Sequence, residues 1–281
     1  MTHVVACVDG SAASPVVCDY GVWASKQLSA PLTLLNVIDK QLFPGSDDWS
    51  GHLGWGTQNE LLEELTSLDE QRAKIAIKQG QSILETAKSH VASKGVEAET
   101  RQRHGDVVDS LTEMESSTRL LIVGKQGNQN DEAHPVGSHI ESIIRTQHKP
   151  ILITQNEFKA PERLLIAYDG SPTLEKSLVL LAGSPLFQGV ELHLLHVGAK
   201  TAVLDEQIRA ATNRLEKAGF TAHSAVHAGE VQPEVQHYIE KHQIDMLMMG
   251  AYGHSRIRQF LIGSITTSML CAVDIPLLIL R

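Results

Sequence analysis

Cysteine is scarce in this chain, and its pattern narrows the class of protein. The 281 residues include three cysteines, Cys7, Cys18 and Cys271, and no two of them form a CxxC pair. A disulfide framework or a zinc site needs paired or clustered cysteines, so an odd and scattered set indicates reduced thiols. We therefore expect a cytoplasmic protein.

Long apolar runs are also missing. No run reaches the roughly 18–20 residues that a transmembrane helix needs. The first residues lack a basic segment and enter an apolar run at once, so we expect no signal peptide. Both observations predict a protein without a membrane partner.

Positive charge is in deficit, with a formal net charge of −9. Nucleic-acid binding requires a basic face, so we expect no nucleic-acid partner. Residues 1–157 carry 13 basic and 21 acidic side chains, whereas residues 158–281 carry 11 and 12. The second part is therefore the less repulsive environment for an anionic ligand.

Familiar catalytic motifs are absent from the sequence. It contains no G-x-S-x-G elbow and no Walker A lysine. His223 and His227 lie four residues apart on an expected strand, about 13 Å, which is too far to share one metal ion. We predict no catalytic residue and no metal site made by protein side chains alone.

What the chain does contain is an internal repeat. The segment Val4-Val-Ala-Cys-Val-Asp-Gly-Ser11 reappears as Leu164-Leu-Ile-Ala-Tyr-Asp-Gly-Ser171, and Leu120–Gly124 reappears as Met246–Gly250. The offset falls from 160 to 126 residues between these pairs, which places a 34-residue insertion after the second strand of the first copy. The repeat predicts two domains, residues 1–157 and 158–281.

Within each copy, continuous apolar runs alternate with helical patterns. Runs such as Val4–Val8 and Leu164–Tyr168 are typical of parallel strands covered on both faces. The segments Val96–Arg101 and Ala222–His227 are less apolar and indicate outer strands. The predicted fold is α/β, with two tandem flavodoxin-like or Rossmann-like domains, each a five-stranded parallel sheet with helices on both faces.

The insertion holds a Gly-rich loop with Trp49 and Trp55, followed by a helical pattern from Glu60 to about Val91. The tryptophans indicate either a lid or docking patch, or rings that pack against their own domain or a sister subunit. The apolar positions of the helix predict core or interface packing. They are Leu61, Leu65, Leu68, Ile75, Ile83 and Ala87.

A spaced glycine pattern, G-x2-G-x9-G-S, follows the fourth strand of each copy. Glycines let backbone N–H groups approach an anion, and the helix that follows adds its positive dipole end. The alternative is that these glycines close turns and cap helices. The pattern comprises Gly250, Gly253, Gly263 and Ser264 in the second copy and Gly124, Gly127, Gly137 and Ser138 in the first.

Each copy also has Asp-Gly-Ser after its first strand and a proline beside its last apolar strand. Together these motifs resemble the universal stress protein family, and the resemblance covers nearly the whole chain, once in each copy. The resemblance implies an adenine nucleotide alpha hydrolase-like fold that binds ATP with Mg²⁺. It places Asp169 beside the ribose or a phosphate-bound metal, and the Val197 backbone against adenine. The second-copy glycines and Ser264 would hold the triphosphate, with Ile265 and Thr266 continuing the helix start. The matching first-copy positions are Asp9, Val37, Gly124, Gly127, Gly137 and Ser138.

The two copies differ inside the nine-residue loop. The second offers Arg256 and Arg258 near the expected phosphates, whereas the first places Asp131 and Glu132 there. Like charges oppose binding, so the sequence favours the second copy as the ATP site and leaves the first as a further candidate.

Three functional hypotheses follow. The leading one is a stress or regulatory protein that binds ATP and hydrolyses it slowly or not at all. The alternatives are a nucleotide-independent tandem scaffold and, less favoured, an enzyme of related fold that cleaves ATP. A dinucleotide-dependent oxidoreductase is disfavoured because the glycines follow the fourth strand instead of the first.

The resemblance also implies how the two copies are arranged. We expect an intramolecular pseudo-dimer in which Ile151–Thr154 meets Leu277–Leu280, so that each strand covers the other's edge. Homodimerisation of the whole chain and an unidentified protein partner stay open.

Overall fold

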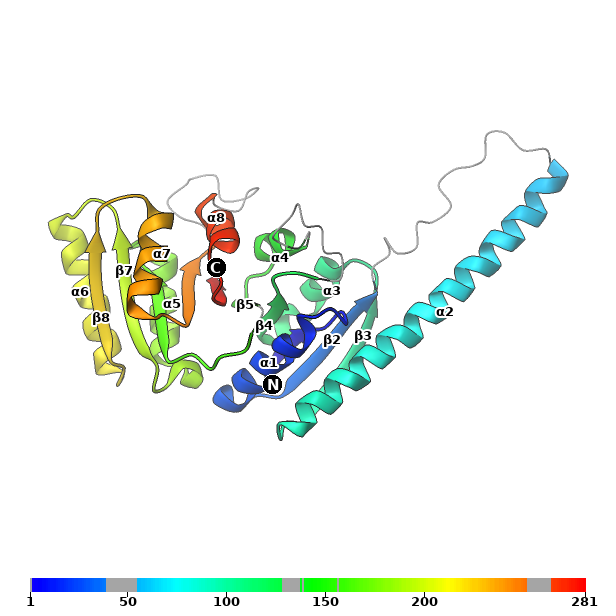
Figure 1. Cartoon of the computed structure of the whole chain (residues 1–281), viewed down its shortest axis with the longest axis horizontal. Coiled ribbons are helices and arrows are strands. Elements are labelled where there is room, and N and C mark those ends of the chain that lie inside the picture. Colours follow the sequence, from blue (N-terminus) through cyan, green and yellow to red (C-terminus); the bar gives the residue numbers. More distant parts are fainter. Residues whose placement is uncertain (1, 39–54, 128–136, 138, 156, 252–263) are drawn as a thin grey trace.

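One ten-stranded sheet spans the described part of the chain, with helices on both faces (Figure 1). The computed structural model describes residues 2–38, 55–127, 137, 139–155, 157–251 and 264–281, and the side chains of 55–65, 69 and 264 lie outside that description. No helix among the described residues is long and apolar enough to cross a membrane.

The two copies contain the same series of strands and α-helices and differ in the position of a short 3₁₀ helix. The first comprises β1 (His3–Cys7), α1 (Ser14–Leu28), β2 (Leu32–Ile38), α2 (Trp55–Ser93), β3 (Ala98–His104), α3 (Val107–Met114), η2 (Glu115–Ser117), β4 (Thr118–Gly124), α4 (Ile140–Thr146) and β5 (Ile151–Thr154). The second comprises β6 (Arg163–Ala167), α5 (Pro172–Ala182), η3 (Pro185–Phe187), β7 (Glu191–Val197), α6 (Ala202–Lys217), β8 (Ala222–His227), α7 (Val231–His242), β9 (Met246–Gly250), α8 (Ser264–Ala272) and β10 (Leu277–Leu280).

The strand order is β3-β2-β1-β4-β5-β10-β9-β6-β7-β8. Within each half the strands are parallel, and the halves join where β5 and β10 pair antiparallel, with Leu152 opposite Leu278. The predicted α/β class and the predicted meeting of Ile151–Thr154 with Leu277–Leu280 are confirmed. The less apolar β3 and β8 form the two outer edges, also as predicted.

Alternation along each strand sends successive side chains to opposite faces of the sheet. Val4 and Ala6 belong to the apolar layer under α1, α2, α5 and α6, whereas Val5 belongs to the layer under α3, α4, α7 and α8. Each strand is therefore covered on both sides, which explains why the central strands read as continuous apolar runs.

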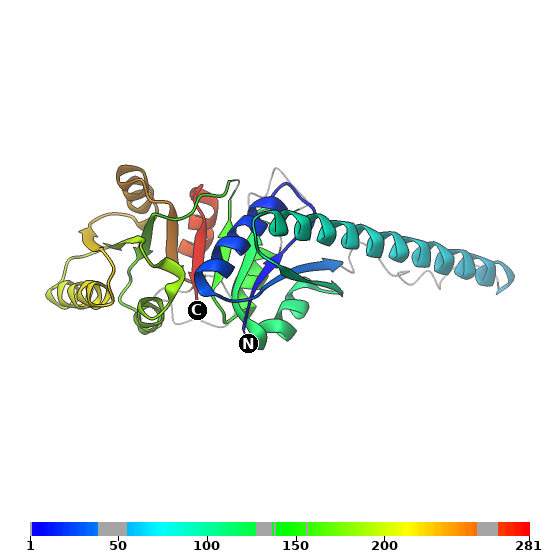
Figure 2. The same ribbon diagram turned by 90° about the horizontal axis from the view of Figure 1, so that it is seen from below.

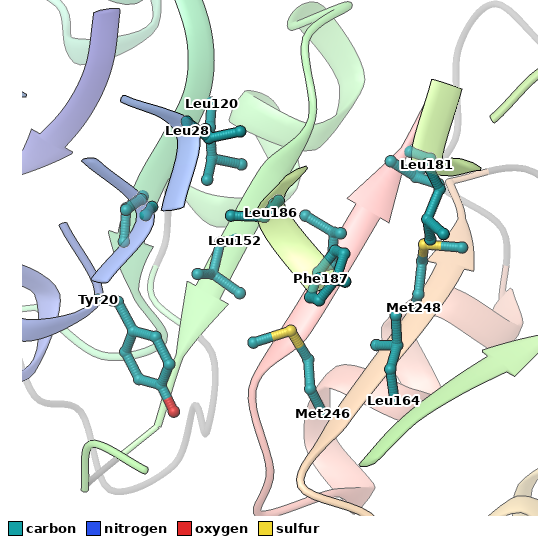
Figure 3. Packing of buried hydrophobic residues seen from close by; sticks show 14 of the residues in the cluster. Tyr20, Leu28, Leu120, Leu152, Leu164, Leu181, Leu186, Phe187, Met246 and Met248 are labelled. Carbon is teal, nitrogen blue, oxygen red and sulfur yellow. The ribbon is translucent and has the colours of Figure 1, made fainter. Parts of the chain in front are cut away.

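Helix α1 of the first half packs against η3 of the second half. The rings of Trp23 and Phe187 lie 5.9 Å apart, and Tyr20 meets Phe158 of the connecting segment edge-on at 4.7 Å. Figure 3 shows Leu186 and Phe187 in the same apolar cluster as Leu152 of the first half and Met246 of the second. This apolar contact extends across the β5–β10 boundary, so the two halves share one core.

The connecting segment is held by a buried carboxylate. Asp245 accepts hydrogen bonds from the backbone N–H groups of Glu162 (3.1 Å) and Arg163 (3.0 Å) and forms an ion pair with Lys159. The Tyr20 hydroxyl donates to the Lys159 carbonyl at 3.1 Å. Both halves therefore anchor the segment just before β6 begins.

The inserted helix α2 is longer than the sequence pattern predicts, 39 residues instead of about 32. Its C-terminal part packs on the sheet, where Leu84, Ala87 and Val91 are buried. Of the two predicted alternatives, core or interface packing, the core does not include Leu68 and Ile75 of its outer part, which are 45% and 64% exposed. In both views this part extends away from the sheet (Figure 1, Figure 2).

Candidate functional site

A cavity of about 270 Å³ lies in the first half, beyond the C-terminal ends of the neighbouring strands β1 and β4. The connections after these two strands run to opposite sides of the sheet, and ligands of doubly wound sheets bind at such a point. Its walls include five residues that the sequence analysis selected. They are Asp9, Val37, Gly124, Gly127 and Gly137.

The turn after β1 fixes the Asp9 carboxylate. Its Oδ1 accepts hydrogen bonds from the Ser11 N–H (2.9 Å) and the Ser14 hydroxyl (3.2 Å), while Ser14 Oγ accepts from the Gly10 N–H at 3.0 Å. Gly10 has φ of +78°, a backbone conformation that would be strained for a residue with a side chain. The turn therefore holds Asp9 in one orientation at the cavity wall.

Gly127 brings the loop after β4 close to that carboxylate. A Cβ on Gly127 would lie 3.0 Å from Asp9 Oδ2, so a larger residue would have to displace either the loop or the carboxylate. The Gly137 N–H donates to the Lys125 carbonyl at 2.9 Å and closes the loop. In this half the helix begins at Ile140, two residues later than the glycine pattern predicts.

Two buried polar atoms on the cavity residues have no hydrogen-bond partner among the described residues. Asn36 donates through Nδ2 to the Val8 carbonyl at 2.8 Å, and its Oδ1 is unpaired. Ser11 Oγ is also buried and unpaired. Buried polar groups are normally satisfied, so these two atoms are expected to have partners beyond the described residues.

Helix α2 forms one wall of the cavity through Ala76, Gln79, Gly80 and Ile83. Gly80 lets the helix approach β2 and β3, since a Cβ there would lie 2.5 Å from Asn36 Oδ1 and 2.1 Å from Gln102 Nε2. The sequence analysis missed Asn36 and this wall. The available signal was the lone glycine in the middle of a long helical pattern.

The second half repeats the turn. Ser171 N–H donates to Asp169 Oδ1 at 2.9 Å, as Ser11 does to Asp9. Val197 and Gly250 end β7 and β9 at the corresponding positions. Tyr168 replaces Val8; it is 2% exposed, and its hydroxyl donates to Glu175 Oε1 at 2.5 Å. The second half therefore has the bulkier Tyr168 at the position where the first half has Val8 on the cavity wall.

Several predicted site positions lie outside the described residues, and their assignment stays a prediction. They are Ser138 in the first half, Gly253, Arg256 and Gly263 in the second, the side chain of Ser264, and Trp49 with the side chain of Trp55 in the insertion. Helix α8 begins at Ser264, as predicted. Ile265 is 43% exposed, and the Thr266 hydroxyl is buried and donates to the Ala251 carbonyl at 3.1 Å.

Among the described residues, the titratable side chains on the cavity wall are Cys7, Asp9 and His139. Burial, together with the nearby Asp9 carboxylate, raises the pKa of the Cys7 thiol to about 12. Cys7 is therefore a protonated thiol at neutral pH and a poor nucleophile. All three cysteines are free, and the described residues contain no cluster of histidine, cysteine or carboxylate side chains suited to a metal ion.

A histidine cluster lies on the other half, away from this cavity. His193 on β7 is 5% exposed, bonds Tyr238 through Nδ1 at 3.0 Å, and stands 5.1 Å from the His223 ring and 5.5 Å from the His242 ring. Glu191 lies 3.5 Å from His193 Nε2. Burial lowers the pKa of His193, and His223, His242 and Arg163 lower it further against the opposing effect of Glu191.

This cluster predicts a pH-dependent stability. The pKa of His193 in the folded state lies below the value of about 6.5 in an unfolded chain. The stability that the neutral His193 contributes to the fold is therefore fully present above about pH 6.5 and is lost as the pH falls below it. The loss reaches about 1.4 kcal/mol per pH unit per proton. Urea unfolding between pH 7 and 5 is expected to show a smaller loss for His193→Gln than for wild type. His104→Gln, at an exposed site on β3, should match wild type, and equal slopes for all three proteins would contradict the prediction.

Comparisons with known proteins agree with this fold. The model of the universal stress protein family matches residues 1–155 and 199–281. Universal stress protein Slr1230 of Synechocystis is 35% identical over 289 residues, covering 100% of both chains. Universal stress protein YxiE of Bacillus subtilis is 27% identical over 150 residues, 53% of this chain and 95% of its own. A universal stress protein crystal structure from Archaeoglobus fulgidus shares the fold, with a TM-score of 0.75, 17% identity, and 99% and 96% coverage.

Proposed function

The chain belongs to the universal stress protein family, and from this premise we propose that it binds ATP with Mg²⁺ in the cavity of its first half. The observation that carries the proposal is the convergence of Asp9, Val37 and the three glycines on one cavity. The bound nucleotide serves a regulatory role, with slow turnover or none.

The residues present fit such a ligand. The cavity, at about 270 Å³, is close to the lower end of the roughly 300–1,000 Å³ typical of small-molecule sites. Asn36 and Ser11 line the cavity with an amide and a hydroxyl, groups that suit a base and a ribose or phosphate oxygen. Mg²⁺, when bound, would offset the repulsion between Asp9 and the phosphates.

Slow turnover is proposed from the side chains around the cavity. Asp9 is held by hydrogen bonds within its own turn, and Cys7 carries its proton at neutral pH. Neither is well placed to activate a water molecule, so His139 is the remaining titratable side chain of the described wall that could act as the base that rapid hydrolysis needs. The nucleotide would then persist long enough to bias a conformation or a contact with another protein.

The proposal places the nucleotide in the first half, although the sequence favours the second. The preference for the second half came from Arg256 and Arg258, which lie in residues 252–263, outside the described part of the chain. That preference stays a prediction, which variants of the two halves test separately.

The nucleotide content of freshly purified protein tests the proposal. Heat extraction and chromatography are expected to release ATP or ADP, and adding ATP with Mg²⁺ at a hundred times its dissociation constant should stabilise the protein by about 2.7 kcal/mol. That gain would raise the melting temperature by roughly 5–10 °C. Absence of nucleotide, with no shift in millimolar ATP, would reject the proposal and favour a nucleotide-independent scaffold.

A further inference from the structure

The outer part of helix α2 is largely exposed at the positions whose side chains are described. Over 39 residues the helix is roughly 58 Å long, and Gly80 is the first buried residue among those whose side chains are described. Residues 66–68, 70–72, 74 and 75 are all exposed, and this part points away from the sheet in both views (Figure 1, Figure 2).

The sequence of this part has heptad spacing. Leu61, Leu65, Leu68, Arg72 and Ile75 follow one another at intervals of four, three, four and three residues, the spacing of a helix seam that packs against another helix. Of these, Leu68 and Ile75 are 45% and 64% exposed. Helices in proteins owe most of their stability to packing of an apolar face, so this face requires a partner.

The charges of the same part are separated along the helix. Residues 60–71 contain acidic residues and no basic one, whereas residues 72–84 contain basic residues and no acidic one. The acidic residues are Glu60, Glu63, Glu64, Asp69 and Glu70, and the basic residues are Arg72, Lys74 and Lys78.

We infer that the outer part of α2 pairs antiparallel with the same part of α2 in a second copy of this chain. Two identical helices with this charge pattern are complementary only when antiparallel, because a parallel pair would place acid beside acid. The twofold axis would cross near Gln71, and Leu68 of each copy would face Ile75 of the other. Such a contact is self-complementary and closes at two copies. It does not depend on nucleotide binding.

The mass of the full chain in solution tests the pairing. Sedimentation between 1 and 100 µM is expected to give twice the mass of one chain for wild type and a dissociation constant at least a hundredfold higher for the Leu68→Glu, Ile75→Glu double variant. Val203→Glu places a carboxylate at another exposed apolar position, 67% exposed on α6, and should leave the mass unchanged. A wild-type monomer at 100 µM, or a dimer that the double variant leaves intact, would overturn the inference.

Charge reversal tests the antiparallel direction. A triple variant that reverses the acidic segment should lose self-association, and a sixfold variant that also reverses the basic segment should regain it. A triple variant that associates as wild type does would rule out the antiparallel arrangement. Helical circular dichroism of each variant checks that the fold persists. The substitutions are Glu64→Lys, Asp69→Lys and Glu70→Lys, followed by Arg72→Glu, Lys74→Glu and Lys78→Glu.

Discussion

Replacing Asp245 with alanine is expected to lower the free energy of unfolding by about 3 kcal/mol. The Asp245 side chain is 4% exposed and accepts hydrogen bonds from two backbone N–H groups, those of Glu162 and Arg163. Each N–H that loses its acceptor while buried costs about 1–3 kcal/mol. The ion pair with Lys159 adds less, because the Lys159 side chain is 66% exposed.

Urea unfolding at neutral pH measures this effect. The matched control is Asp205→Ala, which removes a carboxylate 3.6 Å from Lys200 at a more exposed site and should cost no more than about 1 kcal/mol. If Asp245→Ala cost as little as this control, the connecting segment would be held by other contacts, with the rings of Tyr20 and Phe158 first among them.

Introducing a carboxylate at Gly137 is expected to weaken ATP binding a hundredfold or more. A negative charge about 4 Å from a phosphate costs about 4 kcal/mol at an effective dielectric constant of 20. The fold should tolerate the change, because a Cβ at Gly137 meets its nearest atom, the Lys125 carbonyl oxygen, at 3.4 Å. Titration calorimetry with ATP and Mg²⁺ measures the loss.

Two further variants make this result specific. Gly137→Ala adds the Cβ without the charge and should bind ATP much more tightly than Gly137→Asp. Gly263→Asp makes the same change at the matching position of the second half. If Gly263→Asp alone abolished binding, the second half would be the nucleotide site, as the sequence favours. If Gly137→Asp alone abolished it, the first half would be the site.

The repeat predicted most of the fold because apolar periodicity reports local structure directly. The runs Val4–Val8 and Leu164–Tyr168 identified buried strands, and the carboxyl ends of parallel strands lie along one edge of a sheet. That geometry explains why Asp9 and Gly127, more than a hundred residues apart in the sequence, line one cavity.

Other features depend on tertiary contacts that periodicity does not report. The apolar spacing in the insertion indicated a helix face, but not that Leu68 and Ile75 would lie beyond the end of the sheet. Asn36 is an ordinary polar residue in an apolar strand until Gly80 brings α2 close to its Oδ1. The difference between the halves at Val8 and Tyr168 has meaning only once the cavity is known.

The antiparallel pairing of β5 with β10 affects how the two halves can diverge in evolution. The short connecting segment keeps these strands at an effective concentration in the millimolar range, so dilution does not separate them. In an assembly of two identical chains, each substitution appears on both sides of the axis. Here it appears on one side, so one half can lose or gain a ligand while the other preserves the shared sheet.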